Sequence, residues 1–275
     1  MVFSRSSVLK TDSAELTFHE GGHGGPTVVL LHGLSDDGLC WSRVAARLQA
    51  SHHLLALDAR GHGRSSAPDR GYGTEEHGGD LLALLESLHH PCALWGHSMG
   101  ADVAAWVASR RPALVTALVL EDPPWNEAWR VPQEAESLAR RLQWAADVTA
   151  LQALDDAALT ARAQRDCAGW HPEEIAPWAQ SKRRFRTRAL DYLLTSRPEP
   201  HALARELRCP TLLLTGNPER GALVDDALAE QLVVVSPALR RAHFSAAGHN
   251  VHRDDFDGCA AAVTRFFSSL SDAEG

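Results

Sequence analysis

Five short apolar runs constrain the fold of this chain more than any other feature of its sequence. In each run, three or more consecutive residues are apolar, with threonine at one or both ends of two runs, so that both faces of an extended segment would avoid water. The runs are 27–31, 54–57, 92–95, 117–120 and 211–215. They are followed, in this order, by His-Gly, Asp, Gly, Glu-Asp-Pro and Gly. Strands that are apolar on both faces are typical of a parallel sheet that helices cover on each side.

Segments of helical length separate these runs, near 41–49, 75–89, 99–110, 224–233 and 255–270. The first part of the chain, 8–19, alternates apolar and polar residues and predicts one or two antiparallel edge strands. Strand, helix and strand repeated in this way predict an α/β protein with a doubly wound, mostly parallel sheet.

The alternation stops after Pro123-Pro124 and resumes near Cys209-Pro210. The segment between them has helical spacing and no clear strand, and we predict a helical cap over the carboxyl ends of the sheet, where open α/β sheets bind ligands. The expected division is a core of 1–123 and 206–275 with a cap of 124–205. Five of the eight tryptophans lie in or beside this segment: Trp125, Trp129, Trp144, Trp170 and Trp178. Packing within a helical core would explain each one alone, but as a set they suggest a pocket, with Trp125 and Trp129 as candidate substrate contacts.

Composition excludes several classes of function. The chain has 27 basic and 35 acidic residues, a net charge of −8, which argues against non-specific nucleic-acid binding. No segment reaches the ~18 apolar residues of a membrane span, so we expect a cytoplasmic protein without membrane contact. Five separated cysteines without a C-x-x-C motif predict buried free thiols, and no histidines or cysteines have the spacing of a metal site. We expect no cofactor. The tail 272–275 is predicted to be unstructured. The sequence is compatible with a homodimer through the cap or the edge strand.

The pentapeptide from Gly96 to Gly100 has the pattern G-x-S-x-G. It follows an apolar strand and opens a helix, which is the context that a nucleophilic serine on a sharp turn requires. The flanking glycines let the chain turn without Cβ clashes, and the following helix directs backbone N–H groups at an anion formed there. Ser98 is therefore the candidate nucleophile.

Three further motifs occur in the same order as in a known superfamily: His32-Gly33, the segment 58–65 with the pattern D-x-R-G-x-G-x-S, and Gly248-His249. With these motifs the chain resembles the α/β-hydrolase superfamily from about residue 8 to residue 267. The resemblance implies an eight-stranded sheet with a cap inserted after the sixth strand. It also implies that the backbone N–H groups of Leu34 and Met99 form an oxyanion hole. Segment 58–65 is interpreted as structural, with Arg60 available to pair with a carboxylate.

A serine hydroxyl needs a base within hydrogen-bond reach, and histidine can take its proton and return it to the leaving group. His249 is favoured because it follows a strand-like segment, in a loop that faces the sharp turn around Ser98, here called the elbow. His252 is its only nearby rival. His97, next to the serine, is expected to point under the elbow and pack there.

The acid that orients His249 has two candidates. The usual superfamily position, three residues after the glycine that ends the seventh strand, holds Glu219. The other known position is the end of the sixth strand, as in zearalenone-type lactonases, which the run Glu121-Asp122-Pro-Pro-Trp resembles; it holds Asp122. We favour Asp122 and expect Glu121 to point to the opposite side of the strand.

These residues predict a serine hydrolase that cleaves a small ester or lactone, with an apolar or aromatic portion, through an acyl-enzyme. Carbon–carbon bond hydrolases and cofactor-free perhydrolases use the same triad and remain alternatives. A ligand-binding protein on the hydrolase fold is an alternative from another class, because fold alone does not determine activity.

Overall fold

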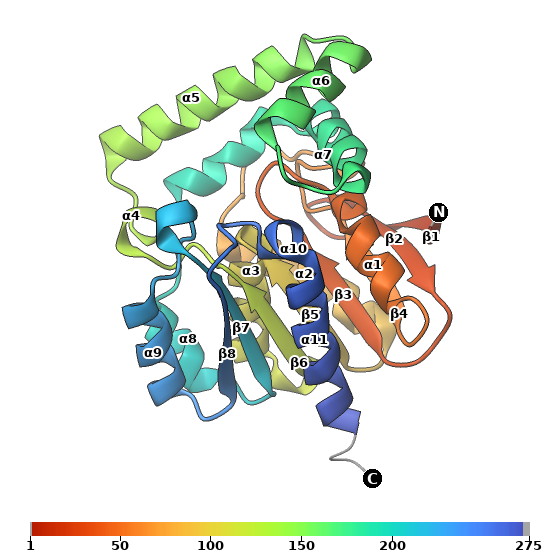
Figure 1. Ribbon diagram of the computed structural model, residues 1–275, viewed down its shortest axis with the longest axis vertical. Helices are drawn as coiled ribbons and strands as arrows, with labels where there is room; N and C mark the ends of the chain where they lie inside the picture. The colour runs from red at the N-terminus through yellow and green to blue at the C-terminus, as the bar shows by residue number, and fades with distance from the viewer. Residues whose placement is uncertain (1, 272–275) are drawn as a thin grey trace.

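An eight-stranded sheet forms the centre of the computed structural model, which describes residues 2–271 (Figure 1). The spatial order is β1-β2-β4-β3-β5-β6-β7-β8. The two pairs that involve β2 are antiparallel and all the others are parallel. The strands are β1 (Phe3–Lys10), β2 (Glu15–Gly22), β3 (Thr27–Leu31), β4 (His53–Leu57), β5 (Cys92–His97), β6 (Val115–Glu121), β7 (Thr211–Gly216) and β8 (Leu239–Phe244). The predicted doubly wound, mostly parallel sheet is confirmed.

Two hydrophobic cores cover the two faces of the sheet, and the sequence of β3 shows why. All five of its residues are buried. Val28 and Leu30 belong to one core, while Val29 and Leu31 belong to the other, because successive side chains of a strand point to opposite faces. A strand buried on both faces is therefore apolar from Val28 to Leu31, and the buried hydroxyl of Thr27 at its start has a hydrogen-bond partner in His53.

Helices supply the other half of each core. One face is covered by α1 (Ser42–Leu48), α10 (Val251–Asp254) and α11 (Phe256–Ser271), and the other by α2 (Thr74–Leu88), α3 (Met99–Arg110), α8 (Pro200–Glu206) and α9 (Asp226–Val235). Short 3₁₀ helices, η1 (Gly38–Trp41), η2 (Pro112–Leu114) and η4 (Pro218–Arg220), lie in the connections. All five cysteines are buried free thiols.

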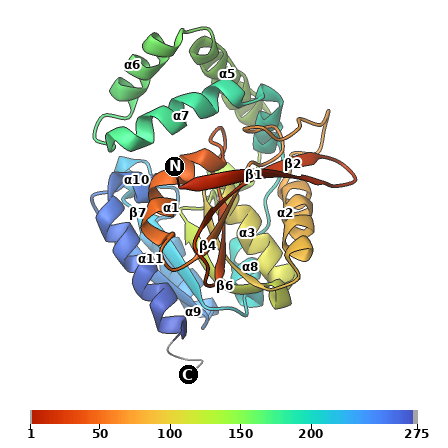
Figure 2. The ribbon, with the colours of Figure 1, turned by 90° about the vertical axis from the view of Figure 1, so that its right-hand side faces the viewer.

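Four α-helices and one 3₁₀ helix inserted after β6 form a cap at one end of the sheet (Figures 1 and 2). They are α4 (Glu127–Arg130), α5 (Glu134–Gln152), α6 (Asp156–Asp166), α7 (Pro172–Arg184) and η3 (Thr187–Leu194). One apolar cluster lies within the cap between α6 and α7, and a second, where α5 meets η3, also includes Tyr72 of the core.

The segment expected to form the cap extended to residue 205, and its last helix lies elsewhere. Helix α8 packs against α3 and α9 beside the sheet. Leu203 and Ala204 are buried in the core between them, so this helix belongs with the core layer. The tail 272–275, predicted to be unstructured, lies outside the described residues. Within residues 2–271, no helix is both long enough and apolar enough to cross a membrane.

Candidate functional site

Ser98 lies at the sharp turn between β5 and α3. Its φ of 53° is in the left-handed region that non-glycine residues rarely adopt, and its N–H donates to the carbonyl of Glu121 at 2.8 Å. The glycines of the motif permit close packing of the helix on the sheet. A Cβ on Gly100 would lie 2.2 Å from the carbonyl oxygen of Leu31, and one on Gly96 would lie 2.3 Å from the carbonyl oxygen of Gly100. The motif thus places the serine hydroxyl above the sheet.

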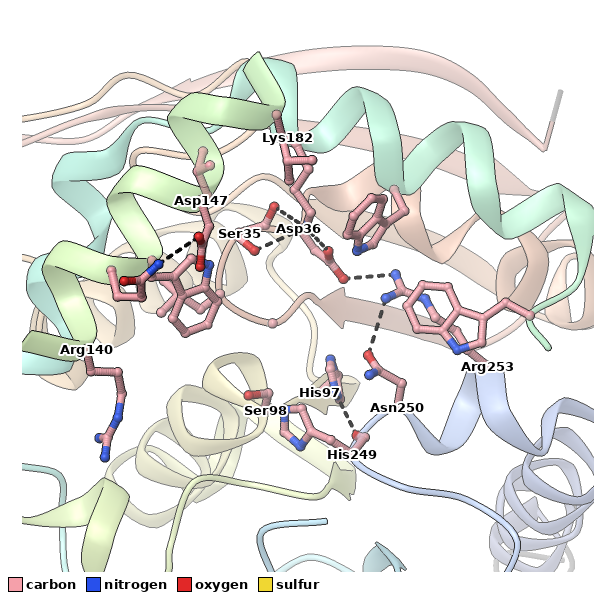
Figure 3. Close-up of a pocket in the computed structure, with 18 residues that line it drawn as sticks. Ser35, Asp36, His97, Ser98, Arg140, Asp147, Lys182, His249, Asn250 and Arg253 are labelled. Atoms are coloured by element: carbon pink, nitrogen blue, oxygen red, sulfur yellow. Dashed lines mark hydrogen bonds and ion pairs between the residues drawn. The ribbon is translucent and has the colours of Figure 1, made fainter. Parts of the chain in front are cut away.

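A cavity of about 520 Å³ lies over this turn, between the core and the cap. The core contributes its floor, including Ser98 and His249, and the cap helices contribute the walls (Figure 3). The lining residues are Gly33, Leu34, Ser35, Asp36, His97, Ser98, Arg140, Gln143, Trp144, Asp147, Val148, Leu151, Trp170, Trp178, Lys182, His249, Asn250 and Arg253.

His249 forms a short hydrogen bond with Asp122. The distance from His249 Nδ1 to Asp122 Oδ2 is 2.6 Å; the Asp122 side chain is fully buried, while that of His249 is 28% exposed. Because Nδ1 donates to the carboxylate, Nε2 is the ring nitrogen left to accept a proton. Asp122 directly follows β6, and its φ of 41° lies in the left-handed region that non-glycine residues rarely adopt.

The loop after β7 provides backbone hydrogen bonds to the Asp122 carboxylate. The N–H groups of Leu223 and Val224 donate to the Asp122 carboxylate at distances from 2.8 to 3.0 Å. Glu219, in the same loop, is exposed, and its backbone N–H is capped by Asn217. The structure therefore brings Asp122, and not Glu219, to His249. Leu223 and Val224 could not be identified from the sequence, because every residue except proline has a backbone N–H that can donate.

A second histidine–carboxylate pair lies beneath the first. Glu121 accepts hydrogen bonds from the backbone N–H of His252 at 2.9 Å and from its Nδ1 at 2.7 Å, and Trp95 donates to the other carboxylate oxygen. Burial alone would raise the pKa of Glu121, but the charge and hydrogen bonds of His252, with His97 nearby, outweigh burial and lower the pKa to about 2. Glu121 and Asp122 bind different histidines, and this separation does not come from strand alternation, because β6 ends at Glu121 and Asp122 has a φ of 41°.

His97 binds the loop of His249 through one hydrogen bond. Its Nε2 donates to the carbonyl of His249 at 3.0 Å, so Nδ1 carries a lone pair; this atom is buried and has no hydrogen-bond partner. Burial lowers the pKa of His97 to about 3, and the ring is neutral near pH 7. His97 therefore acts as a hydrogen-bonding residue that anchors the loop of His249, and it also lines the cavity.

The loop after β3 contains His32, whose hydrogen bonds hold the loop in place, and Leu34, which lines the cavity. His32 donates from Nδ1 to the carbonyl of Gly33 at 2.8 Å and accepts from the N–H of Ala59 at Nε2, at 3.0 Å. Leu34 follows and lines the cavity. Met99 is the first residue of α3, where backbone N–H groups have no acceptor within the helix.

Segment 58–65 has polar contacts that serve the fold. Asp58 accepts from the backbone N–H groups of Gly38 and Arg64, both at 2.8 Å. Arg60 forms a two-pronged ion pair with buried Asp80, with both distances 2.7 Å. The carboxylate partner expected for Arg60 is thus present, and neither charged group lines the cavity.

The tryptophans divide into two groups, and the two that we expected to contact substrate are not those at the cavity. Trp125 is buried in the core and donates to Asp102 at 2.9 Å. Trp129 packs under the Arg140 guanidinium, 4.4 Å away, outside the lining. Trp144, Trp170 and Trp178 form cavity wall instead. Trp144 and Trp178 lie on α5 and α7, Trp170 lies between α6 and α7, and the sequence did not reveal how these parts of the cap face the core.

Comparison with known proteins places the chain in a family. The sequence profile of the alpha/beta hydrolase family matches residues 28–262. N-formylmaleamate deformylase of Pseudomonas putida is 29% identical over 253 residues, which are 89% of this chain and 90% of that protein. The crystal structure of an N-formylmaleamic acid deformylase from Pseudomonas putida S16 has a TM-score of 0.79 at 20% identity, covering 94% of this chain and 100% of that one. E-2-(acetamidomethylene)succinate hydrolase has the same TM-score at 24% identity, covering 96% and 99%. The chain is therefore an enzyme of the hydrolase class that belongs to the alpha/beta hydrolase family.

Proposed function

We propose that this enzyme hydrolyses a small carboxylic ester or lactone through an acyl-enzyme, with Ser98 as nucleophile, His249 as base and Asp122 as orienting acid. The single observation that carries the proposal is the 2.6 Å hydrogen bond between His249 Nδ1 and Asp122 Oδ2 beside the serine turn. It fixes the tautomer in which His249 Nε2 can accept the serine proton.

The reaction has two halves. Ser98 Oγ attacks the carbonyl carbon while its proton passes to His249 Nε2, and collapse of the tetrahedral intermediate breaks the bond to the leaving group, which takes that proton. Water then attacks the acyl-enzyme by the same route and releases the acid and free Ser98. Buried Asp122 stabilises the positive charge that His249 carries in each intermediate.

The oxyanion of each intermediate needs hydrogen-bond donors. Our candidates are the backbone N–H groups of Leu34 and Met99, from the loop after β3 and from the first residue of α3. Their flanking position around Ser98 and the open N-terminus of α3 support this assignment.

The cavity supports a small substrate with a flat or apolar portion. Its volume is about 520 Å³, and Trp144, Trp170 and Trp178 form much of its apolar wall. Indole faces suit aromatic or unsaturated groups.

Hydrolysis of an N-acyl amide is a second candidate, and one observation favours it. The relative with 29% identity matches this chain almost from end to end and is named for the deformylation of N-formylmaleamate. The same acyl-enzyme chemistry cleaves a carbon–nitrogen bond when His249 protonates the leaving nitrogen.

A panel of p-nitrophenyl esters, lactones and N-acyl amides, assayed with the wild type and with Ser98→Ala, tests the proposal. The wild type should turn over at least one class and react with a fluorophosphonate probe, and Ser98→Ala should do neither. Ser109→Ala, a change of the same type farther along α3, is the matched control and should retain activity. Activity that persists in Ser98→Ala would contradict the mechanism, while substrate binding without turnover by the wild type would indicate a ligand-binding role.

A further inference from the structure

One turn of cap helix α7 reaches the loop that follows β3. Ser181 Oγ donates to the carbonyl of Ser35 at 3.2 Å, and Arg184 Nε donates to Asp37 at 2.8 Å. Lys182 lies between them in the sequence and binds both Ser35 and Asp36. The cap is therefore fastened to the loop that bears Leu34.

Lys182 uses its whole hydrogen-bonding capacity on this loop. Its Nζ lies 2.8 Å from the carbonyl oxygen of Ser35, 3.1 Å from Ser35 Oγ and 2.8 Å from Asp36 Oδ1. An ammonium group has three N–H donors, and these three acceptors account for all of them. Although Lys182 lines the cavity, its side chain is only 5% exposed and no N–H remains for a substrate.

Ser35, the residue that Lys182 holds, has a strained backbone. Its φ is 70°, in the left-handed region that costs a serine on the order of 1 kcal/mol. Its N–H donates to His62 Nε2 at 3.2 Å, and its carbonyl accepts from Lys182. Both backbone polar groups of Ser35 thus have hydrogen-bond partners, and Leu34 is the residue directly before it.

Asp36 joins this contact to the loop of His249. Its second carboxylate oxygen accepts from Arg253, which lies four residues after His249, at 2.9 Å (Figure 3). Burial would raise the pKa of Asp36, but Arg253 and Lys182 outweigh it and hold the pKa well below the ordinary range. Glu174 on α7 lies 3.5 Å from Arg253. The positive charges of Lys182 and Arg253 are therefore matched by the negative charges of Asp36 and Glu174.

We propose that Lys182 is a positioning residue for the oxyanion hole: by holding the Ser35 carbonyl, it fixes the direction of the Leu34 N–H. The inference rests on the proposed function, since the oxyanion hole belongs to that mechanism. Oxyanion donors act on the transition state more than on the bound substrate, and an error of about 1 Å can cost about 10²-fold in rate. Loss of Lys182 should therefore lower kcat and leave KM nearly unchanged.

The test compares Lys182→Met with Arg183→Met in the full-length enzyme. Arg183 is the neighbouring cation on α7, but it donates to Gln152, Leu154 and Asp156 within the cap. Lys182→Met should lower kcat by roughly 10- to 100-fold and weaken the binding of a boronic acid, which forms a tetrahedral adduct with Ser98, by a similar factor. Affinity for the carboxylic acid product should stay within about threefold. Arg183→Met should leave kcat and boronate affinity within about twofold.

Two results would overturn the proposal: a folded Lys182→Met with the kcat of the wild type, or a rise in KM at constant kcat, which would indicate direct contact with substrate. If Lys182→Met does not fold, the double variant Asp36→Asn/Lys182→Met decides, because it removes one charge of each sign and leaves Arg253 beside Glu174. It should show the same loss in kcat. Failure of the proposed function would be separate, because it would appear as activity retained by Ser98→Ala.

Discussion

His249 and His252 lie three residues apart, and each donates Nδ1–H to a carboxylate from the end of β6, at 2.6 Å to Asp122 and 2.7 Å to Glu121. Their surroundings differ. The His249 side chain is 28% exposed and borders the cavity, whereas that of His252 is 3% exposed and stacks on Trp41 with ring centroids 4.7 Å apart. A histidine–carboxylate pair can therefore serve proton transfer or the stability of the fold, and access of Nε2 to a substrate distinguishes the two roles.

The largest effect should come from replacing each histidine in turn. His249→Ala should lower kcat by roughly 10⁴- to 10⁶-fold, because Ser98 loses the base that we propose for it. His252→Ala should retain most activity but lose stability, since it leaves the buried Glu121 carboxylate without its partner, a change that typically costs about 3–5 kcal/mol. Steady-state kinetics and urea unfolding of both variants measure the two effects. A His252→Ala variant that folds normally and is inactive would assign the base to His252.

The carboxylates provide the next contrast. Asp122→Asn should lower kcat by at least about 10²-fold, because the amide can donate to His249 Nδ1 and so favour the wrong tautomer. Glu219→Gln should stay within about tenfold, since its exposed carboxylate does not contact His249. Kinetics of the two variants on one substrate distinguish the positions. A crippled Glu219→Gln beside a nearly normal Asp122→Asn would place the acid in the loop after β7.

The contacts of Asp122 also show how far the sequence could predict this site. The elbow around Ser98 and the buried strands followed from local rules, because glycine spacing and apolar runs reflect contacts of the residues themselves. The candidate acid followed from counting along a resembling motif. The amide donors of Leu223 and Val224 had no such signal, because any residue except proline offers a backbone N–H.

The cap was the least predictable part for a related reason. Helical spacing in 124–205 predicted helices, but the cavity wall depends on how α5 and α7 pack against the core. Trp125 and Trp178 are the same residue type in similar local sequence, yet one is buried beside Asp102 and the other lines the cavity. The contact of Lys182 with Ser35 spans 147 positions, and no local pattern encodes such a pairing.

The buried pair of His252 and Glu121 should make the free energy of unfolding depend on pH. The pKa of Glu121 is lowered from 4.5 to about 2, so its ionised form stabilises the folded state above about pH 4.5, and this contribution is lost as the pH falls through 2. The contribution is on the order of 3 kcal/mol near pH 7. Glu121→Gln should be destabilised at pH 7 and approach the wild type as the pH falls from 5 to 3, as measured by urea unfolding. Glu219→Gln, the exposed control, should differ from the wild type by less than about 0.5 kcal/mol throughout.

The smallest expected effect concerns the wall of the cavity that His249 lines. Trp178→Leu removes one indole from the wall, and the ratio of kcat/KM for aromatic esters to that for acetate should fall about three- to tenfold, as expected for an aromatic contact of about 0.5–1.5 kcal/mol. The ratio is the informative quantity, because Trp178 lies 4.7 Å from Lys182 and any disturbance of the oxyanion loop would slow both substrates alike. Trp125→Leu, which also loses an indole but lies outside the cavity lining, should lower stability and leave the ratio unchanged. If both variants shift the ratio equally, the wall formed by Trp178 does not select the substrate.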